Sequence, residues 1–320
     1  MSKGPTRREF IQGTITGATG IAALGALGKA DPPPGKVAST LVRAASDSGA
    51  AAGASGKRFE MPIRYVPWTV NYEDEFPEDK FAPIERRVGF DPELSALILL
   101  DVWSWHFMPT YRERAGLITR ERIKPVAEAC RKAGVLVVHA PSPPVANKYP
   151  EHRFWPASEW KRQPMYSPPG EAPGWPAPEM ASRTGRFKEY SQKSSPDAPR
   201  LTEEQLYRKY NIHPAVGPEP NDLVVATREE LHGLLAKHKR FHLFYAGFVS
   251  NGCILERDYG TRQMAYLGYQ IILLRDCTTG LETSETIGTF EQTKASVHNL
   301  EFWFSTSTSG AMLDGLGKIA

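Results

Sequence analysis

The chain has 320 residues, of which 41% are hydrophobic and 23% are charged, and its formal net charge at pH 7 is +3. A chain of this length and composition can bury the core of one large globular domain. The small net charge, without a basic stretch interleaved with aromatic residues, argues against a nucleic-acid partner.

Residues 1–30 have the pattern of an export signal. Arg7 and Arg8 precede a glycine- and alanine-rich, mildly apolar stretch that runs to about Gly28. This pattern resembles a twin-arginine signal, which implies a periplasmic or otherwise exported protein; the alternative is a disordered basic tail. The stretch is too short and too rich in glycine for a permanent membrane span, so we expect no stable span after signal removal. Residues 31–57, rich in Pro, Ala, Gly and Ser, are expected to be a flexible linker before a domain at 58–320.

The three cysteines, Cys130, Cys253 and Cys277, do not suggest a disulfide framework. They cannot all pair, and none lies in a Cys-x-x-Cys spacing typical of metal sites. A protein exported in its folded state would form its core in a reducing compartment and could keep a free thiol.

The first half of the predicted domain contains one β-α-β unit. After a polar lead-in, the apolar run 96–100 ends in Asp101 and is typical of a strand buried on both faces. Residues 119–133 are predicted to form a helix that Thr119 caps and Gly134 ends, and 135–139 are predicted to form the next strand.

This alternation stops in the central segment, residues 141–220. The segment is rich in proline, contains Trp155, Trp160 and Trp175, and is too long for a plain connection. Segments of this length inside a domain are usually functional or have local structure of their own. We therefore expect a lid over the site, an oligomer contact, or a surface excursion held by its aromatic side chains.

The second half returns to alternating elements. Strands are predicted at 223–226, 241–246, 270–274 and 300–304, and helices at 228–239, 253–268 and 285–299. Together the elements predict a doubly wound α/β domain, with a mostly parallel sheet of about six strands and helices on both faces. In such sheets ligands bind beyond the carboxyl ends of strands, where Asp101, His139 and Cys253 are expected.

The segment from Tyr245 to Cys253 ends an apolar run in a small-residue turn and places one cysteine at the start of a predicted helix. Unpaired N–H groups and the helix dipole at that position can lower a thiol pKa and can bind an oxyanion. The alternative is that Cys253 is a small buried residue of the core.

Several motifs together resemble the isochorismatase-like cysteine hydrolases over roughly residues 96–304. They are Leu100-Asp101, Val138-His139-Ala140, the loop from Gly247 to Cys253, Gly268-Tyr269 and Arg275-Asp276. The central segment has no counterpart in this resemblance.

The resemblance implies that Cys253 is a nucleophile, that Asp101 is the base that takes its proton, and that the reaction passes through a thioester. It also implies a cis peptide bond at Phe248–Val249, which turns the N–H of Val249, beside that of Cys253, toward the oxyanion. The implied partner is a small-molecule substrate, no organic cofactor is implied, and a homo-oligomer is possible because such oligomers are common in the family.

The sequence departs from the family at the position of its third catalytic residue, a lysine. After the strand that precedes the cysteine strand, Thr227 stands at this position and, with Glu230, has the pattern of a helix capping box. Arg228 could supply a fixed positive charge, although a guanidinium cannot shuttle protons, and Lys209 of the central segment could reach the site. The third explanation is a site that has lost turnover.

Aromatic residues and histidines are candidates for the substrate pocket. His106 and His139, with His152 as a weaker candidate, either line the pocket or are satisfied histidines of the core, and no metal site is expected from their spacing. Trp103 and Trp105 either form an aromatic wall for a planar substrate or pack beneath the central segment.

The sequence therefore predicts a cysteine-dependent hydrolase of a small amide-type carbon–nitrogen substrate. The alternative is a catalytically degenerate member of the same fold that binds a small ligand or a partner. A third possibility is hydrolysis of an ether of the isochorismate type, which does not need a cysteine nucleophile.

Overall fold

The computed structural model describes residues 58–67, 78–154, 175–191 and 202–319. The predicted signal at 1–30 and the predicted linker at 31–57 lie outside the described residues and stay predictions. Among the helices in the described ranges, none is both long enough and apolar enough to cross a membrane.

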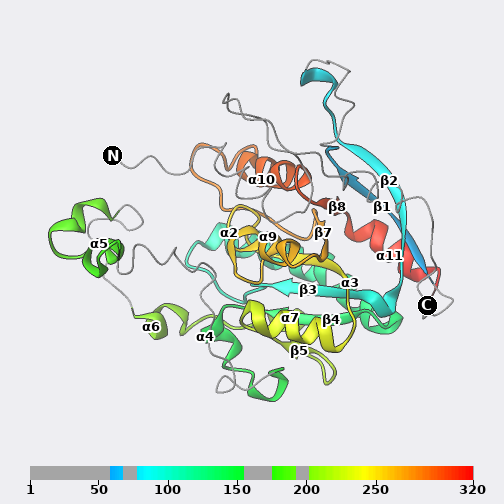
Figure 1. Cartoon of the computed structure of the whole chain (residues 1–320), viewed down its shortest axis with the longest axis horizontal. Helices are drawn as coiled ribbons and strands as arrows, with labels where there is room; N and C mark the ends of the chain where they lie inside the picture. Colours follow the sequence, from blue (N-terminus) through cyan, green and yellow to red (C-terminus); the bar gives the residue numbers. More distant parts are fainter. Residues whose placement is uncertain (1–57, 68–77, 155–174, 192–201, 320) are drawn as a thin grey trace, which may run out of the picture. The chain divides into compact units, whose positions relative to one another are not determined.

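One eight-stranded sheet, with the strand order β2-β1-β8-β7-β6-β3-β4-β5, forms the centre of the domain (Figure 1). Its strands are β1 (Phe59–Tyr65), β2 (Ile84–Phe90), β3 (Ser95–Leu100), β4 (Leu136–Ala140), β5 (Leu223–Val224), β6 (His242–Gly247), β7 (Gln270–Leu274) and β8 (Ser305–Ser307). The six strands from β8 to β5 are parallel, whereas β1 is antiparallel to both β2 and β8. The predicted doubly wound, mostly parallel sheet is confirmed.

The two additional strands, β1 and β2, form a hairpin in what the sequence indicated to be a polar lead-in. The outer strand β2 is exposed over its first four residues, which include Glu85, Arg86 and Arg87. Charged residues are common on edge strands because they discourage pairing with a second chain. Because of these charged residues, a search of the sequence for apolar runs does not find this strand.

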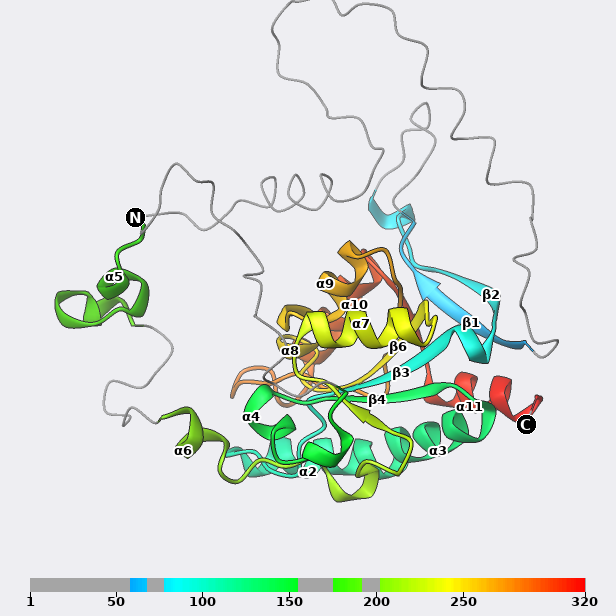
Figure 2. The same ribbon diagram turned by 60° about the horizontal axis from the view of Figure 1, so that its bottom comes forward.

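Helices cover both faces of the sheet. They are α2 (Pro109–Ile118), α3 (Lys124–Ala133), α4 (Pro143–Ala146), α5 (Pro178–Ser182), α6 (Glu203–Tyr207), α7 (Arg228–Lys237), α8 (Cys253–Glu256), α9 (Thr261–Tyr266), α10 (Glu291–Glu301) and α11 (Ser309–Gly317). The shorter helical turns are η2 (Glu78–Lys80), η3 (Pro92–Leu94), η4 (Thr119–Ile123, a π-helical turn), η5 (Pro150–His152), η6 (Gly185–Tyr190) and η7 (Pro214–Val216). Figure 2 shows α2, α3 and α11 on one side of the sheet, and α7, α9 and α10 on the other.

The alternation of side chains along β3 produces two cores. Leu97 and Leu99 belong to the cluster under α3 and α11, whereas Ile98 and Leu100 belong to the cluster under α7, α9 and α10. Successive residues of a strand point to opposite faces, so a strand covered on both sides must be apolar throughout. This packing fixes the end of β3, and the residue after it, in the middle of the sheet.

Three predicted helices differ from those observed. The helix predicted to begin at Thr119 begins at Pro109, and Thr119 lies inside it with its hydroxyl bonded to the Ala115 carbonyl. The predicted end at Gly134 is confirmed, with φ at 81°. The helix predicted at 285–299 begins at Glu291, so the last strand moves to Ser305–Ser307.

The helix predicted at 253–268 is divided into α8 and α9. A Cβ at Gly260 would lie 2.9 Å from the carbonyl oxygens of both Ile254 and Arg257. The chain folds back on itself at this glycine, and Arg257 has an extended backbone as the C-cap of α8. Arg257 thereby lies at a break in the helical structure, one turn after Cys253.

Candidate active site

Asp101 lies at the carboxyl end of the central strand β3 and is completely buried. Its Oδ1 accepts hydrogen bonds from the backbone N–H of Ser142, at 2.7 Å, and from the Ser142 hydroxyl, at 3.0 Å. Its Oδ2 accepts a bond from Arg257 Nε at 2.9 Å, and Arg257 Nη2 also donates to the Ser142 hydroxyl. The carboxylate is therefore held at both oxygens.

The loop from Gly247 to Cys253, called the cysteine loop below, is brought close to this carboxylate because strands β6 and β3 approach each other closely. Gly247, the last residue of β6, has φ at 131°, and a Cβ there would lie 1.9 Å from the Leu100 carbonyl oxygen. Only glycine fits this position. The next residue, Phe248, donates its N–H to the same carbonyl at 2.9 Å. The Phe248–Val249 peptide bond is cis, which confirms the prediction.

Cys253 begins α8 and lies near the acid. The Asp101 carboxylate and the backbone of Val249 are both close enough to act on the pKa of its thiol. The structure thus brings together three of the residues that the sequence analysis selected. Of the three cysteines, Cys130 and Cys277 are buried and Cys253 is partly exposed.

The pKa of the Cys253 thiol differs from the value that the sequence led us to expect. Burial, and next the negative charge of Asp101, raise the pKa of Cys253 to about 12, against an opposing effect of Arg257. The expected lowering by a helix N-terminus is not found: α8 has only four residues, and burial together with the Asp101 charge raises the pKa instead. At neutral pH the thiol keeps its proton.

Two opposing effects act on Asp101. Burial raises its pKa, and the positive charge of Arg257, with the polar groups of Arg257, Cys253 and Ser142, offsets only part of this effect, so the pKa stays above its ordinary value. For Arg257, burial alone would lower the pKa, but the ion pair with Asp101 leaves it raised, so the guanidinium stays charged. The two side chains form a charge pair in which each sustains the ionisation of the other.

Arg257 is the residue that the sequence analysis missed. Thr227 caps α7 by accepting a hydrogen bond from the Glu230 N–H at 3.1 Å. The second half of the predicted capping box is wrong, because the Glu230 carboxylate bonds the N–H of Ala226 instead. Arg228, the proposed substitute, pairs with Glu229 at 2.9 Å. The only available signal for Arg257 was its spacing, one helical turn after Cys253.

Lys209, the other candidate cation, lies in the central segment. Its Nζ is 5.0 Å from the centroid of the Trp105 ring, an arrangement typical of a cation–π contact. The cation that contacts Asp101 is therefore Arg257 and not the lysine that the sequence suggested.

The two tryptophans pack under the central segment. The ring of Tyr210 meets Trp103 and Trp105 edge-on, with centroid distances of 4.9 Å and 5.1 Å. Burial, and then the charges of Tyr207, Asp101 and Cys253, raise the pKa of Tyr210 to about 12. The two tryptophans therefore pack against Tyr210, a residue of the central segment.

His106 is a neutral histidine next to the same aromatic cluster. Its Nδ1 accepts the Met108 N–H at 3.2 Å, and its ring meets Tyr111 at 4.5 Å between centroids. Burial lowers its pKa to about 4. His106 can therefore contribute a neutral ring to this region at physiological pH.

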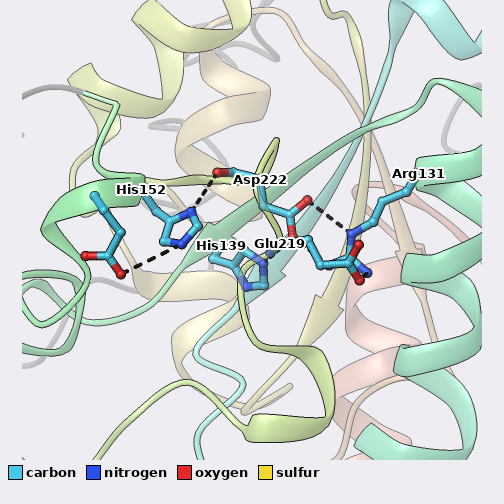
Figure 3. A network of polar contacts seen from close by, with 6 residues as sticks. Arg131, His139, His152, Glu219 and Asp222 are labelled. Atoms are coloured by element: carbon cyan, nitrogen blue, oxygen red, sulfur yellow. Dashed lines mark hydrogen bonds and ion pairs between the residues drawn. The ribbon is translucent and has the colours of Figure 1, made fainter.

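His139 belongs to a structural network and not to the group around Asp101 (Figure 3). Its Nε2 lies 3.0 Å from Asp222 Oδ2, and Asp222 also accepts two hydrogen bonds from Arg131. His152 Nδ1 lies 3.4 Å from the Asp222 carbonyl, and Arg131 pairs with Glu219 at 2.8 Å. The network joins the two ends of the central segment, where the chain leaves β4 and where it returns to β5.

No metal centre is evident where the chain is described: no group of three or more His, Cys, Asp or Glu side chains there could hold an ion.

Two cavities are lined by described residues. One, of about 470 Å³, includes Gln270 and Ser305, the first residues of β7 and β8, and lies at the end of the sheet opposite Cys253. The other, of about 510 Å³, lies between α4 and α6 and includes Pro143 and Tyr207, next to the Ser142 that holds Asp101. Because it lies next to Ser142, the second cavity is the better candidate for a part of the functional site.

Comparisons with known proteins give a family match and a set of similar solved structures. The family model described as "Isochorismatase domain" matches residues 95–301. No curated protein matches the chain. Among solved structures, a cysteine hydrolase from Pseudomonas syringae pv. phaseolicola is 14% identical, with 72% of this chain and 96% of that chain covered and a TM-score of 0.43. An N-carbamoylsarcosine amidase from Thermoplasma acidophilum is 14% identical, with 67% and 96% covered and a TM-score of 0.35. A nicotinamidase/pyrazinamidase from Bacillus subtilis is 15% identical, with 68% and 97% covered and a TM-score of 0.33.

Proposed function

Because the chain belongs to the isochorismatase family of hydrolases, we propose that it is a cysteine-dependent hydrolase of a small amide-type carbon–nitrogen substrate. The observation that carries this proposal is the buried carboxylate of Asp101, which accepts a hydrogen bond from the Arg257 guanidinium and acts on the pKa of the nearby Cys253 thiol. A nucleophile, a base within hydrogen-bond reach, and a third group that orients the base are the parts that covalent catalysis requires.

In the first half of the proposed reaction, the Cys253 sulfur attacks the amide carbon while its proton passes to Asp101. The negative charge on the carbonyl oxygen is stabilised by the N–H groups of Val249 and Cys253. The carbon–nitrogen bond then breaks, Asp101 returns the proton to the leaving nitrogen, and a thioester and an amine or ammonia are formed.

In the second half, Asp101 takes a proton from water, and the oxygen of the water attacks the thioester carbon. The carbon–sulfur bond breaks, the proton returns to the Cys253 sulfur, and a carboxylic acid is released. The high thiol pKa suits this scheme, because the proton leaves the sulfur only as the new bond forms.

Arg257 has an electrostatic role in this scheme. A guanidinium does not release its proton in proteins, so the proton transfers all pass through Asp101. The fixed positive charge keeps a completely buried carboxylate able to accept a proton, which burial alone would oppose. Arg257 thus replaces the charge of the family lysine but not its ability to exchange a proton.

The test is release of ammonia or amine from a panel of small amides and ureides, with the parent protein compared to Cys253→Ala and Asp101→Asn. We expect turnover of at least one compound by the parent and none by either variant. Equal traces from all three proteins across the panel contradict the enzyme and favour the ligand-binding alternative. Turnover of an ether substrate that survives stoichiometric alkylation of Cys253 favours the ether-hydrolase alternative.

A further inference from the structure

The peptide group that joins Pro141 to Ser142 lies between the acid of the proposed site and a buried tyrosine. Its N–H, which belongs to Ser142, donates to Asp101 Oδ1 at 2.7 Å. Its carbonyl, which belongs to Pro141, accepts a hydrogen bond from the Tyr259 hydroxyl at 2.9 Å. The Tyr259 hydroxyl, this peptide group and the Asp101 carboxylate therefore form one continuous chain of hydrogen bonds.

A chain of this kind transmits an effect from one end to the other. A hydrogen bond to the carbonyl of a peptide group strengthens the bond that its N–H donates, because both bonds polarise the same group of atoms. Such bonds are stronger away from water, and Tyr259, Ser142 and Asp101 are all buried. An ionised carboxylate gains more from a donor than a neutral carboxyl does. The Tyr259 hydroxyl therefore favours the charged form of Asp101 through one peptide group.

The turn that follows α8 contacts the acid and its neighbours through two side chains. Arg257, two residues before Tyr259, donates through Nε to Asp101 Oδ2 and through Nη2 to the Ser142 hydroxyl. The backbone of this turn is held separately, because the Tyr245 hydroxyl of β6 donates to the Tyr259 carbonyl at 2.9 Å. The loss of the Tyr259 hydroxyl would therefore leave this support of the turn in place.

We propose that Tyr259 is a positioning residue of the active site: its hydroxyl holds the Pro141–Ser142 peptide group in the orientation that favours the ionised form of Asp101. This inference rests on the proposed function, in which Asp101 is the base. Arg257 and Tyr259 then act on the same carboxylate, the first through its charge and the second through a hydrogen bond of the backbone.

The acid limb of an activity profile can report on Asp101 in spite of the other ionisable groups around it. Within the described part of the chain, the side chains that interact electrostatically with this carboxylate are Arg257, Cys253, Tyr111, Tyr210 and Tyr259. Burial raises the pKa of the cysteine and of the three tyrosines, and the guanidinium keeps its charge. These five groups therefore keep their ionisation in the acid range, where Asp101 takes up its proton.

The test compares Tyr259→Phe with the parent in the pH dependence of kcat/KM. The variant loses one hydroxyl and keeps the ring, so ionised Asp101 is favoured less. The acid limb should therefore move to higher pH by about half a unit, and below this limb kcat/KM should fall about threefold. The loss should lie in kcat and not in KM, because Asp101 transfers the proton in the transition state.

The matched control is Tyr245→Phe. Tyr245 is as completely buried as Tyr259, and its hydroxyl also donates to a backbone carbonyl at 2.9 Å. Both variants should lower the melting temperature by a similar amount, whereas Tyr245→Phe should keep the acid limb of the parent. An unmoved acid limb in Tyr259→Phe overturns the proposal, because it indicates a structural role alone. An equal displacement in both variants overturns it as well, because it indicates a general loosening of the turn.

A measurement without substrate separates this inference from the proposed function. The NMR chemical shift of the Asp101 side-chain carboxyl carbon, assigned by its loss in Asp101→Asn, follows the ionisation of the acid directly. In Tyr259→Phe the midpoint of this titration should rise by about half a pH unit, and in Tyr245→Phe it should stay at the parent value. An unmoved midpoint in Tyr259→Phe overturns the inference even if the parent proves to be an active amidase. A displaced midpoint supports it even if the parent turns over none of the amides, and then the proposed function alone is wrong.

Discussion

The Nε atom of Arg257 lies 2.9 Å from Oδ2 of Asp101, and the Asp101 side chain is fully buried while 24% of the Arg257 side chain is exposed. A buried carboxylate without a counter-charge takes up a proton and can no longer act as a base. The ion pair with Arg257 opposes this proton uptake, although burial still leaves the pKa of Asp101 above its ordinary value. The chemistry of the site depends on this one contact.

Two replacements of Arg257 should distinguish the effect of its positive charge from the effect of its hydrogen-bond geometry. In Arg257→Gln the pKa of Asp101 rises further, so the acid limb of kcat/KM moves to higher pH and activity at pH 7 falls about a hundredfold or more. Arg257→Lys keeps the charge but loses the fork geometry, so its loss should be smaller. Steady-state kinetics from pH 5 to pH 9 measure both effects. Equal profiles of the two variants would argue against an electrostatic role.

The same replacement should change how stability depends on pH. When the folded-state pKa of Asp101 is above its unfolded value, the folded state binds the proton more tightly, and the free energy of unfolding decreases as pH rises through the interval between the two values. Arg257→Gln widens this interval, so the variant should lose more stability than the parent as pH rises above the unfolded value of about 4. Urea denaturation at several pH values measures this; parallel curves for the two proteins would contradict it.

Removal of the nucleophile should abolish turnover without unfolding the protein. Cys253→Ala is expected to lower kcat by at least about a thousandfold, because no other group near Asp101 can form the thioester. The Cys253 side chain is small and partly exposed, so the melting temperature should change by no more than about 2 °C. Cys130→Ala, at a buried core position, is the control and should keep kcat while it lowers stability.

Gly247 and Gly268 provide a matched test of the close approach below the cysteine loop. Both have positive φ, but a Cβ at Gly247 meets the Leu100 carbonyl at 1.9 Å, whereas a Cβ at Gly268 has nothing within 4 Å. Gly268→Ala should cost about 1 kcal/mol of unfolding free energy, the cost of the backbone conformation. Gly247→Ala should cost about 3 kcal/mol or more and should displace the loop, so that kcat also falls. Similar losses in both variants would contradict this explanation.

The network around Asp222 should stabilise the domain in a pH-dependent way. Its hydrogen bonds from His139 and Arg131 outweigh burial and lower the pKa of Asp222 to about 2. A lowered pKa contributes stability above the unfolded value near 4, and this contribution is lost as pH falls from about 4 to 2. Asp222→Asn should therefore be less stable than the parent by about 2–4 kcal/mol at pH 7, with a smaller difference at pH 3. Denaturant titration at both pH values is the measurement, and a constant difference would count against the network.

Export remains a prediction from residues 1–30. Replacement of Arg7 and Arg8 by lysine should reduce translocation through a twin-arginine pathway. Fractionation of a bacterial host that expresses the full chain measures this. An unchanged distribution between fractions would favour the disordered-tail alternative.

Several features could be predicted because they depend on local pattern. The apolar run of β3 and the small residues before Cys253 mark a buried strand and a tight turn, since only such residues suit those places. The family resemblance added the roles of Asp101 and Cys253 and the cis bond at Phe248–Val249. The hairpin β1–β2 was missed because its edge strand is charged and exposed.

Pattern alone could establish the parallel sheet and the two strand ends that carry Asp101 and Cys253, because burial on both faces requires apolar runs and a tight turn requires glycine. It could not establish which cation reaches the acid. Arg228 and Arg257 are equally plausible in one dimension, and the choice depends on a contact between residues 156 positions apart. It could not place His139 with Asp222 either, because these residues are 83 positions apart and meet only in the folded domain.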